Sequence, residues 1–292
     1  MNLYAQIAAN RRRTFFLFFF TFLVIILLGY LFGAYQGDPY SGAVLAFIFS
    51  LGYSGVAYFF SDKIVLGISG AKPIAKEDNP NLYRTVENLC IGAGLPLPKI
   101  YIIEEPAMNA LATGRDPRHA VVAVTRGLLD KLEDEELEGV LAHELSHIRN
   151  FDIRTMTLAA VLAGAIVMLA DIFLRSMSDS SGSDSRKSGA GVLLLIGLIL
   201  SLLSPIFAQL IKLAISRQRE FLADSSGALL TRYPEGLAKA LEKISADKTP
   251  LRHVSEATAH LYIENPLTTG MFVGLFATHP PVEERIKRLR VA

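Results

Sequence analysis

Leu141-Ala142-His143-Glu144-Leu145-Ser146-His147 contains two histidines four residues apart and a glutamate directly after the first of them. On an α-helix, residues at this spacing lie on one face with Cβ atoms about 5–6 Å apart, so both imidazoles can bind a single metal ion. Glu144 can then reach a water molecule on that ion. The H-E-x-x-H spacing is typical of helical zinc sites, so one zinc ion per chain is the expected cofactor.

The residues around this motif predict the helix that its chemistry requires. Asp134 is the expected N-cap, Glu135 and Glu136 suit the first turn, and apolar side chains recur at helical spacing up to Leu145. The expected fold class is α+β and predominantly helical. Further helices are predicted at residues 80–93 and 127–132, strands at 99–103 and 120–124, and a short extended piece at 109–113.

Four long apolar stretches without charged residues predict an integral membrane protein with four transmembrane helices. They cover residues 14–37, 42–60, 155–170 and 188–211, and mean hydropathy is high at +0.36. A bilayer needs about 20 apolar residues per helix, so each stretch is expected to cross it once. The alternatives are a signal peptide for the first stretch, which is too long for one, and buried core helices for the last two.

These stretches divide the chain into a first hairpin, a soluble part, a second hairpin and a second soluble part. The boundaries are residues 1–63, 64–154, 155–211 and 212–292. Lysines and arginines flank the stretches on the side of the soluble parts, which places the N-terminus and the His143 domain in the cytoplasm. A formal net charge of +1 gives no case for nucleic acid, and the single cysteine, Cys90, allows no intrachain disulfide.

A catalytic zinc site needs a third protein ligand, and the best candidate follows the last apolar stretch. Glu220 and Asp224 are four residues apart and share a helix face. Glu220 can complete a site with two histidines, while Asp224 can accept a hydrogen bond from the outer ring nitrogen of one histidine. The alternative is that Glu220 pairs with Arg217 or Arg219 on a solvated face.

Four motifs together closely resemble the HtpX-type membrane zinc metallopeptidases, which are relatives of the CAAX prenyl proteases. The resemblance covers nearly the whole chain, including the order of the membrane segments. The motifs are His143-Glu144-Leu145-Ser146-His147-Ile148-Arg149-Asn150-x-Asp152, Ser216-Arg217-x-Arg219-Glu220-x-x-Ala223-Asp224, Asn109-Ala110-x-Ala112-Thr113-Gly114 and Thr278-His279-Pro280-Pro281.

The resemblance implies a gluzincin-like zinc peptidase core in the cytoplasmic membrane of a prokaryote, with endoproteolytic quality control of membrane proteins as its role. It makes His143, His147 and Glu220 the zinc ligands and Glu144 the general base. In the related prenyl proteases, a His-Pro motif with an arginine some residues later is assigned to the oxyanion. His279 is therefore the expected second oxyanion donor, with Arg285 as a helper. The alternative for His279 is a surface loop.

An extended substrate is expected to pair with a free strand edge, which the strand at residues 121–124 would present, together with Asn109 and Ala110. The expected substrate-binding residues are therefore Asn109, Ala110, Val122, Val124 and Arg285. The alternative is an ordinary core strand. The expected partners are protein substrates and the lipid bilayer.

Two other functions compete with peptide hydrolysis. A non-proteolytic membrane scaffold or holdase would hold a structural zinc, but such sites are closed by four protein ligands, and the sequence offers three and a base. A small transporter would carry polar residues inside its membrane segments, and these stretches contain almost none.

Overall fold

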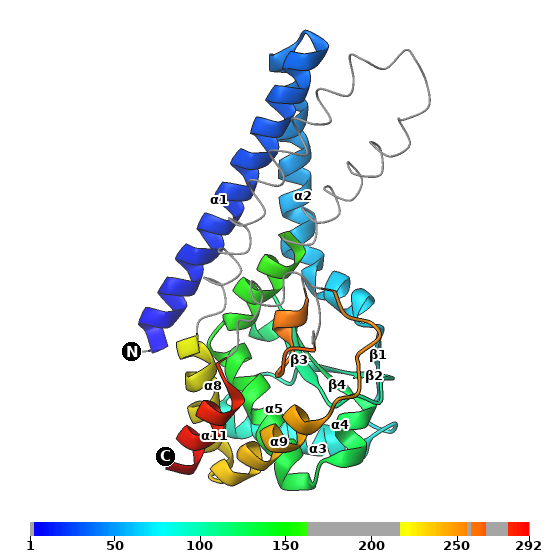
Figure 1. Cartoon of the computed structure of the whole chain (residues 1–292). Coiled ribbons are helices and arrows are strands. Elements are labelled where there is room, and N and C mark those ends of the chain that lie inside the picture. The colour runs from blue at the N-terminus through cyan, green and yellow to red at the C-terminus, as the bar shows by residue number, and fades with distance from the viewer. Residues whose placement is uncertain (1–2, 163–216, 256–257, 267–279, 292) are drawn as a thin grey trace.

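The computed structural model describes residues 3–162, 217–255, 258–266 and 280–291, and it has two parts, a long helical hairpin and a mixed domain (Figure 1). The hairpin consists of α1 (Leu3–Gln36) and α2 (Pro39–Ile68). Asp38 caps α2, because its carboxylate accepts a hydrogen bond of 3.1 Å from the backbone N–H of Ser41. The two helices approach so closely that a side chain at Gly42 would collide with the carbonyl oxygen of Gly29.

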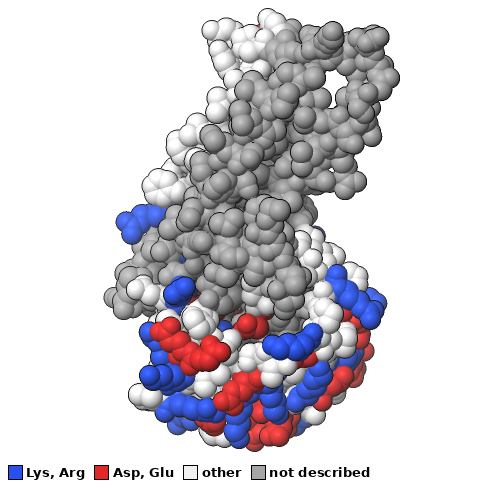
Figure 2. All heavy atoms as spheres, in the orientation of Figure 1, with Lys and Arg blue, Asp and Glu red and all other residues white. Residues whose placement is uncertain are grey.

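The hairpin exposes large apolar side chains along its length. Among them are Phe15, Phe16, Leu45, Ile48, Phe49 and Phe59. Among the described residues, two segments are long and apolar enough to cross a membrane, Thr14–Leu31 and Pro39–Ile68. Figure 2 shows that charged side chains gather over the mixed domain, whereas the described outer part of the hairpin is largely uncharged. Exposed apolar side chains in this number, on helices of this length, are typical of a membrane hairpin.

The first two expected membrane stretches therefore lie on α1 and α2. Of the third, residues 155–162 are helical and buried, and the rest lies outside the described residues together with the whole fourth stretch. This described helical piece packs on the hairpin. The hydroxyl oxygens of Thr14 and Thr155 are 3.2 Å apart, and the Tyr53 hydroxyl donates a hydrogen bond of 3.1 Å to the carbonyl oxygen of Val161.

The mixed domain contains a four-stranded sheet in the order β1-β2-β4-β3. β2 and β4 are parallel, and the two outer pairs are antiparallel. The strands are β1 (Ala71–Pro73), β2 (Lys99–Ile103), β3 (Ala110–Gly114) and β4 (Ala120–Thr125).

The expected free edge at residues 121–124 is wrong, because β4 is a central strand. Val122 pairs with Ile100 on one side and with Ala112 on the other, and Val124 is likewise enclosed between β2 and β3. Every residue of β4 is buried. Both of its edges are occupied by the sheet itself, so no substrate can add to it.

Helices cover the sheet, and α5 (Asp134–Arg149) is the one at the centre of the domain (Figure 1). Its buried face joins the sheet residues in one apolar core. It packs against α3 on one side of the undescribed segment in sequence and against α8 and α9 on the other. The other helical elements are α3 (Pro80–Ala93), η1 (Pro117–His119), α4 (Arg126–Lys131), α8 (Arg217–Thr231), α9 (Pro234–Ala246), η3 (Ala259–Leu261) and α11 (Val282–Val291).

The expected N-cap at Asp134 is one residue too late. Glu133 is the N-cap, and its backbone N–H donates a hydrogen bond of 2.9 Å to the side chain of Glu136. The same Glu136 oxygen accepts a 2.6 Å bond from Lys243 of α9. Glu136 therefore ties the start of α5 to α9, and this sets where the helix begins.

Candidate metal centre

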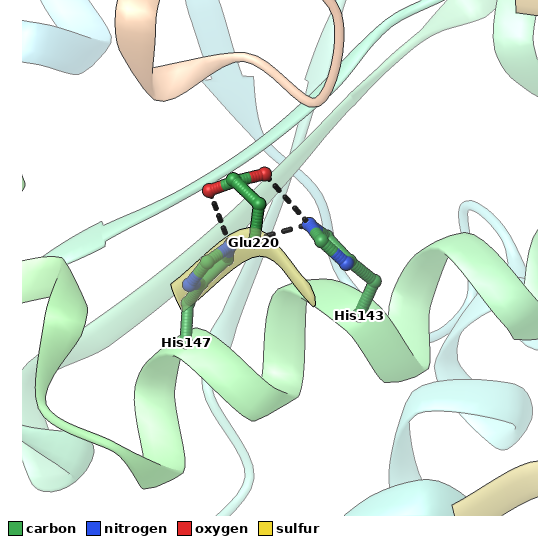
Figure 3. Close-up of side chains that lie close together, drawn as sticks. All are labelled: His143, His147 and Glu220. Atoms are coloured by element: carbon green, nitrogen blue, oxygen red, sulfur yellow. Dashed lines mark hydrogen bonds and ion pairs between the residues drawn. The ribbon is translucent and has the colours of Figure 1, made fainter. Parts of the chain in front are cut away.

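Three side chains from two helices meet inside the domain (Figure 3). His143 and His147 point from α5 towards Glu220, which lies in the first turn of α8. The two Nε2 atoms are 3.2 Å apart, and the Glu220 carboxylate lies 3.7 Å from Nε2 of His143 and 3.5 Å from Nε2 of His147. All three side chains are buried. The structure thus brings together the three residues that the sequence proposes as metal ligands.

The close approach of α8 to α5 depends on Gly227. A Cβ atom at this position would lie 3.0 Å from the backbone nitrogen of His143, which is closer than nearly all real Cβ contacts. Because that neighbour is backbone, it cannot rotate away as a side chain can. A glycine on α8 two turns after Glu220 therefore lets the carboxylate reach the histidines.

Asp224 lies behind His143 on the side away from Glu220. Its Oδ1 is 2.9 Å from Nδ1 of His143, which is the position that the sequence proposes for it. Arg285 of α11 holds Asp224 with two hydrogen bonds of 2.8 and 2.9 Å, and donates a third of 3.0 Å to the carbonyl oxygen of Ile263. A chain of contacts thus runs from α11 to the imidazole.

Asp152 occupies the equivalent place behind His147. Its Oδ2 is 3.2 Å from Nδ1 of His147, and its other oxygen is 3.5 Å from Nε of Arg219. Each histidine is therefore backed by a carboxylate and an arginine. Sequence reasoning gave Asp152 no role, although it belongs to the extended His143 motif. The signal that could have found it is an acidic residue five positions after a ligand, just past the end of the helix.

Among the described residues of the site, buried carboxylates outnumber buried arginines. The four buried carboxylates belong to Glu144, Asp152, Glu220 and Asp224, and the two buried arginines are Arg219 and Arg285. Taken as ionised, these six groups together carry two more negative than positive charges, and a buried excess charge is costly in a low-dielectric interior. A divalent cation between the histidines and Glu220 would balance this excess.

The pKa values of the two histidines reflect burial and the charged groups around them. Burial lowers the pKa of His143 below its usual 6.5, although the neighbouring Asp224 carboxylate opposes the effect. Burial also acts to lower the pKa of His147, but the hydrogen bond with Asp152 and the charge of Glu220 raise it to about 9 overall. The surrounding carboxylates therefore favour a positive charge on His147, and the same carboxylates would stabilise a metal cation bound there.

The donor set fits one tetrahedral metal ion. When the imidazoles are neutral, the aspartate facing each Nδ1 favours a proton on that nitrogen, which leaves both Nε2 lone pairs facing the shared space. Ligand atoms around a tetrahedral zinc ion lie about 3.3 Å apart, given bonds of about 2.0–2.1 Å. The observed separations of 3.2 to 3.7 Å match this spacing. Glu144, next to His143 on α5, is buried beside the cluster.

Arg285 does not face a substrate, contrary to the sequence-based expectation. Its side chain is completely buried, and its guanidinium is committed to Asp224 and the backbone of Ile263. It lies behind the metal ligands as a supporting residue. His279, the expected oxyanion donor, lies outside the described residues.

Asn109 and Ala110 lie at the edge strand, but the chain itself pairs with that edge. The carbonyl oxygen of Ala110 accepts a hydrogen bond of 2.9 Å from the N–H of Ile263, and Leu111 bridges Tyr262. The side chain of Asn109 donates a bond of 2.9 Å to the carbonyl oxygen of Glu264. An extended peptide could therefore pair with this part of β3 only after residues 261–264 move away.

Comparisons with known proteins identify a protein family, sequence relatives and a solved structure that this chain resembles. Residues 76–292 match the model of peptidase family M48. The chain is 50% identical to a protease HtpX homolog from Thermoanaerobacter pseudethanolicus, covering 99% of this chain and 97% of the relative. It is 46% identical to a protease HtpX homolog from Tropheryma whipplei, covering 99% and 98%. The crystal structure of S. mikatae Ste24p shares the fold, with a TM-score of 0.51 at 20% identity, and the similarity covers 91% of this chain and 62% of that one.

Proposed function

Because the chain belongs to peptidase family M48 and is therefore a metalloprotease, we propose that it is a membrane-bound zinc endopeptidase. Its substrates would be membrane or membrane-associated proteins. The observation that carries the proposal is the buried cluster of His143, His147 and Glu220, with Glu144 directly beside it on α5. Three ligands and a neighbouring carboxylate suit a catalytic site better than the closed four-ligand site of a scaffold or holdase.

His143, His147 and Glu220 would hold the zinc ion. When bound, zinc lowers the pKa of a water molecule towards neutrality and polarises the scissile carbonyl. Asp224 and Asp152 keep the Nδ1 proton on each imidazole, so that both Nε2 lone pairs stay directed into the site. Arg285 and Arg219 hold these two aspartates in turn. The ligand geometry is thus fixed before a substrate arrives.

Glu144 is the proposed general base. It takes the proton from the attacking water and then delivers it to the nitrogen of the leaving amine, so the peptide bond breaks without releasing a free amide anion. The negative charge that develops on the carbonyl oxygen needs a further donor. We assign that role to His279, which precedes Pro280 and Pro281 in the sequence just before α11 begins at Val282.

The wider arrangement is also part of the proposal. Residues 64–154 and 212–292 would form one gluzincin-like catalytic domain, with membrane hairpins at 1–63 and 155–211. The basic residues beside the membrane stretches support a cytoplasmic N-terminus and catalytic domain in a prokaryotic cell membrane. A site tethered in this way would cleave misfolded chains at or leaving the bilayer, as in membrane protein quality control.

Removal and return of the metal test the proposal. The full-length chain in detergent should cleave casein, lose cleavage after treatment with 1,10-phenanthroline, and regain it with zinc. The Glu220→Ala variant should purify with little zinc and should not be rescued at the same zinc concentration. A metal-free chain that cleaves at the original rate would contradict the mechanism. A zinc-loaded chain that cleaves no protein would favour the scaffold.

A further inference from the structure

A cavity of about 540 Å³ lies where α2 meets the sheet, and its lining includes none of the three candidate metal ligands. Its walls come from residues 59–63 of α2, from Leu97 and Lys99 around the start of β2, and from the β3–β4 connection with the first residues of β4. Pockets for small molecules usually measure about 300–1,000 Å³. The cavity is therefore large enough for a small ligand or a lipid headgroup.

Positive side chains dominate this cavity. Lys63, Lys99, Arg115 and Arg118 line it, and Asp62 is the single carboxylate among its described lining residues. Arg115 lies 3.7 Å from Asp116, which is also bound by His119. Within the described part of the chain, Lys63, Lys99 and Arg118 have no acidic partner within 4 Å. A concave surface with several unpaired cations favours an anionic ligand.

The cavity also lies at the depth of lipid headgroups. Residues 42–60 of α2 carry no charge, and 19 helical residues span ~28 Å, close to the hydrocarbon thickness of a bilayer. Asp62 and Lys63 are the first charged residues after this stretch. At its end, Phe59 and Phe60 are about half exposed, with Arg115 over the Phe59 ring at 5.4 Å and Lys63 over the Phe60 ring at 5.0 Å. At a membrane interface, lysine and arginine side chains lie along apolar surface and keep their charged ends in the polar layer.

We propose that this cavity binds the phosphate of an anionic phospholipid headgroup. The cations would contact the phosphate, while Phe59 and Phe60 would pack against the upper acyl chains. An acidic polypeptide is the other class of anion, but the apolar aromatic wall continuous with the lipid-facing surface of α2 favours a lipid. The inference goes beyond peptide hydrolysis and needs only that α2 crosses the membrane.

Native mass spectrometry of the full-length chain in detergent tests the proposal. Dioleoylphosphatidylglycerol should bind at one saturable site, and dioleoylphosphatidylcholine should not compete for it. In the variant Lys63→Gln/Lys99→Gln, the affinity for dioleoylphosphatidylglycerol should fall by roughly 10- to 30-fold, since each cation near a membrane surface strengthens the binding of anionic lipid. Lys239→Gln/Lys287→Gln removes the same charge from exposed positions on α9 and α11 and should leave affinity unchanged. Lys63→Arg/Lys99→Arg should retain binding.

Three results would overturn the proposal. The first is equal affinity of the two glutamine double variants, which would mean a general attraction to the domain. The second is full displacement of the lipid by an equal concentration of glycerol 3-phosphate, which would identify a free phosphate compound as the ligand. The third is that Lys63 and Lys99 are needed for binding of poly-L-glutamate but not for binding of the lipid, which would identify an acidic polypeptide as the ligand. Arg118→Gln, a single exposed change, tests the same prediction if the double variant fails to fold. Casein cleavage in detergent is a separate readout, so failure of the lipid site and failure of the proposed protease remain distinguishable.

Discussion

Replacing Arg285 by methionine should weaken metal binding although it removes no metal ligand. Arg285 is completely buried on α11, and its guanidinium makes two hydrogen bonds to Asp224, which in turn lies 2.9 Å from Nδ1 of His143. Methionine fills much of the same space but supplies no charge and no donor. The Asp224 carboxylate would then stay buried without its main partner.

The size of the effect follows from these contacts. Breaking a buried ion pair by removing one partner costs about 3–5 kcal/mol of folding stability, because the other charge is left uncompensated. Loss of a contact that orients a metal-bound histidine lowers metal affinity by about 10- to 100-fold. The double variant Arg285→Met/Asp224→Asn removes both charges, so it should lose less stability than the sum of the two single variants.

Two measurements on the same samples test whether Arg285 supports metal binding through Asp224. Zinc affinity is measured by competition with a chromophoric chelator, and the free energy of unfolding by denaturant titration in detergent. Arg288→Met is the matched control on the same helix. Arg288 is exposed, pairs with Glu284 and lies over the ring of Phe221 at 3.7 Å, so its loss should cost no more than about 2 kcal/mol and leave zinc affinity unchanged.

The reasoning would be refuted if Arg285→Met kept full zinc affinity and slowed only cleavage. In that case Arg285 would act on the substrate, as the sequence suggests, and not through Asp224. A uniform loss of zinc affinity in Arg285→Met and Arg288→Met would also refute it, since the effect would then belong to α11 as a whole.

Three further changes test other parts of the structure. Gly227→Ala should push α8 away from the backbone of His143, costing about 1–3 kcal/mol and lowering zinc affinity; unchanged affinity would show that the close approach is unnecessary. Asp152→Asn should lower zinc affinity by about 10- to 100-fold in the same competition assay, and no change would remove Asp152 from the support of His147. Burial raises the pKa of Asp247, but hydrogen bonds from Thr249, Lys131 and the Met108 backbone lower it to about 2, below its usual 3.8. This carboxyl therefore stabilises the fold above pH ~4 and loses that contribution as the pH falls towards 2. Between pH 5 and 3, the free energy of unfolding of the unmodified chain should fall by about 1 kcal/mol more than that of Asp247→Asn. Parallel plots of unfolding free energy against pH for the two chains would contradict this.

The sequence predicts the helix and the ligands well because their geometry is local. His143 and His147 share a helix face by spacing alone, and the structure confirms the helix at Asp134–Arg149. Glu220 could be proposed only because a two-histidine motif needs a further ligand. That α8 actually reaches α5 depends on packing at Gly227, which no local pattern reveals.

The strand edge was wrongly assigned, although the sequence contains a signal against it. Residues 120–124 form a continuous apolar run, and such a run is typical of a strand buried on both faces inside a sheet. The pairing of Ala110 with Ile263 could not be foreseen, because the two residues are far apart in sequence and joined by tertiary structure.

Arg285 and Asp152 show a second limit of sequence reasoning. An arginine on an amphipathic helix is usually exposed, and only the fold shows that Arg285 points inward to Asp224. Asp152 lies just beyond the end of α5, so its contact with His147 depends on how the chain turns there. Phe151, with a φ of 58°, makes that turn.

The most direct test of the central claim is the zinc content and casein cleavage of Glu144→Gln, measured on one purified sample. Glutamine keeps the size of the side chain but cannot accept a proton from water. The proposed mechanism predicts one zinc ion per chain and no detectable cleavage. Cleavage at the rate of the unmodified chain, with zinc bound, would contradict it.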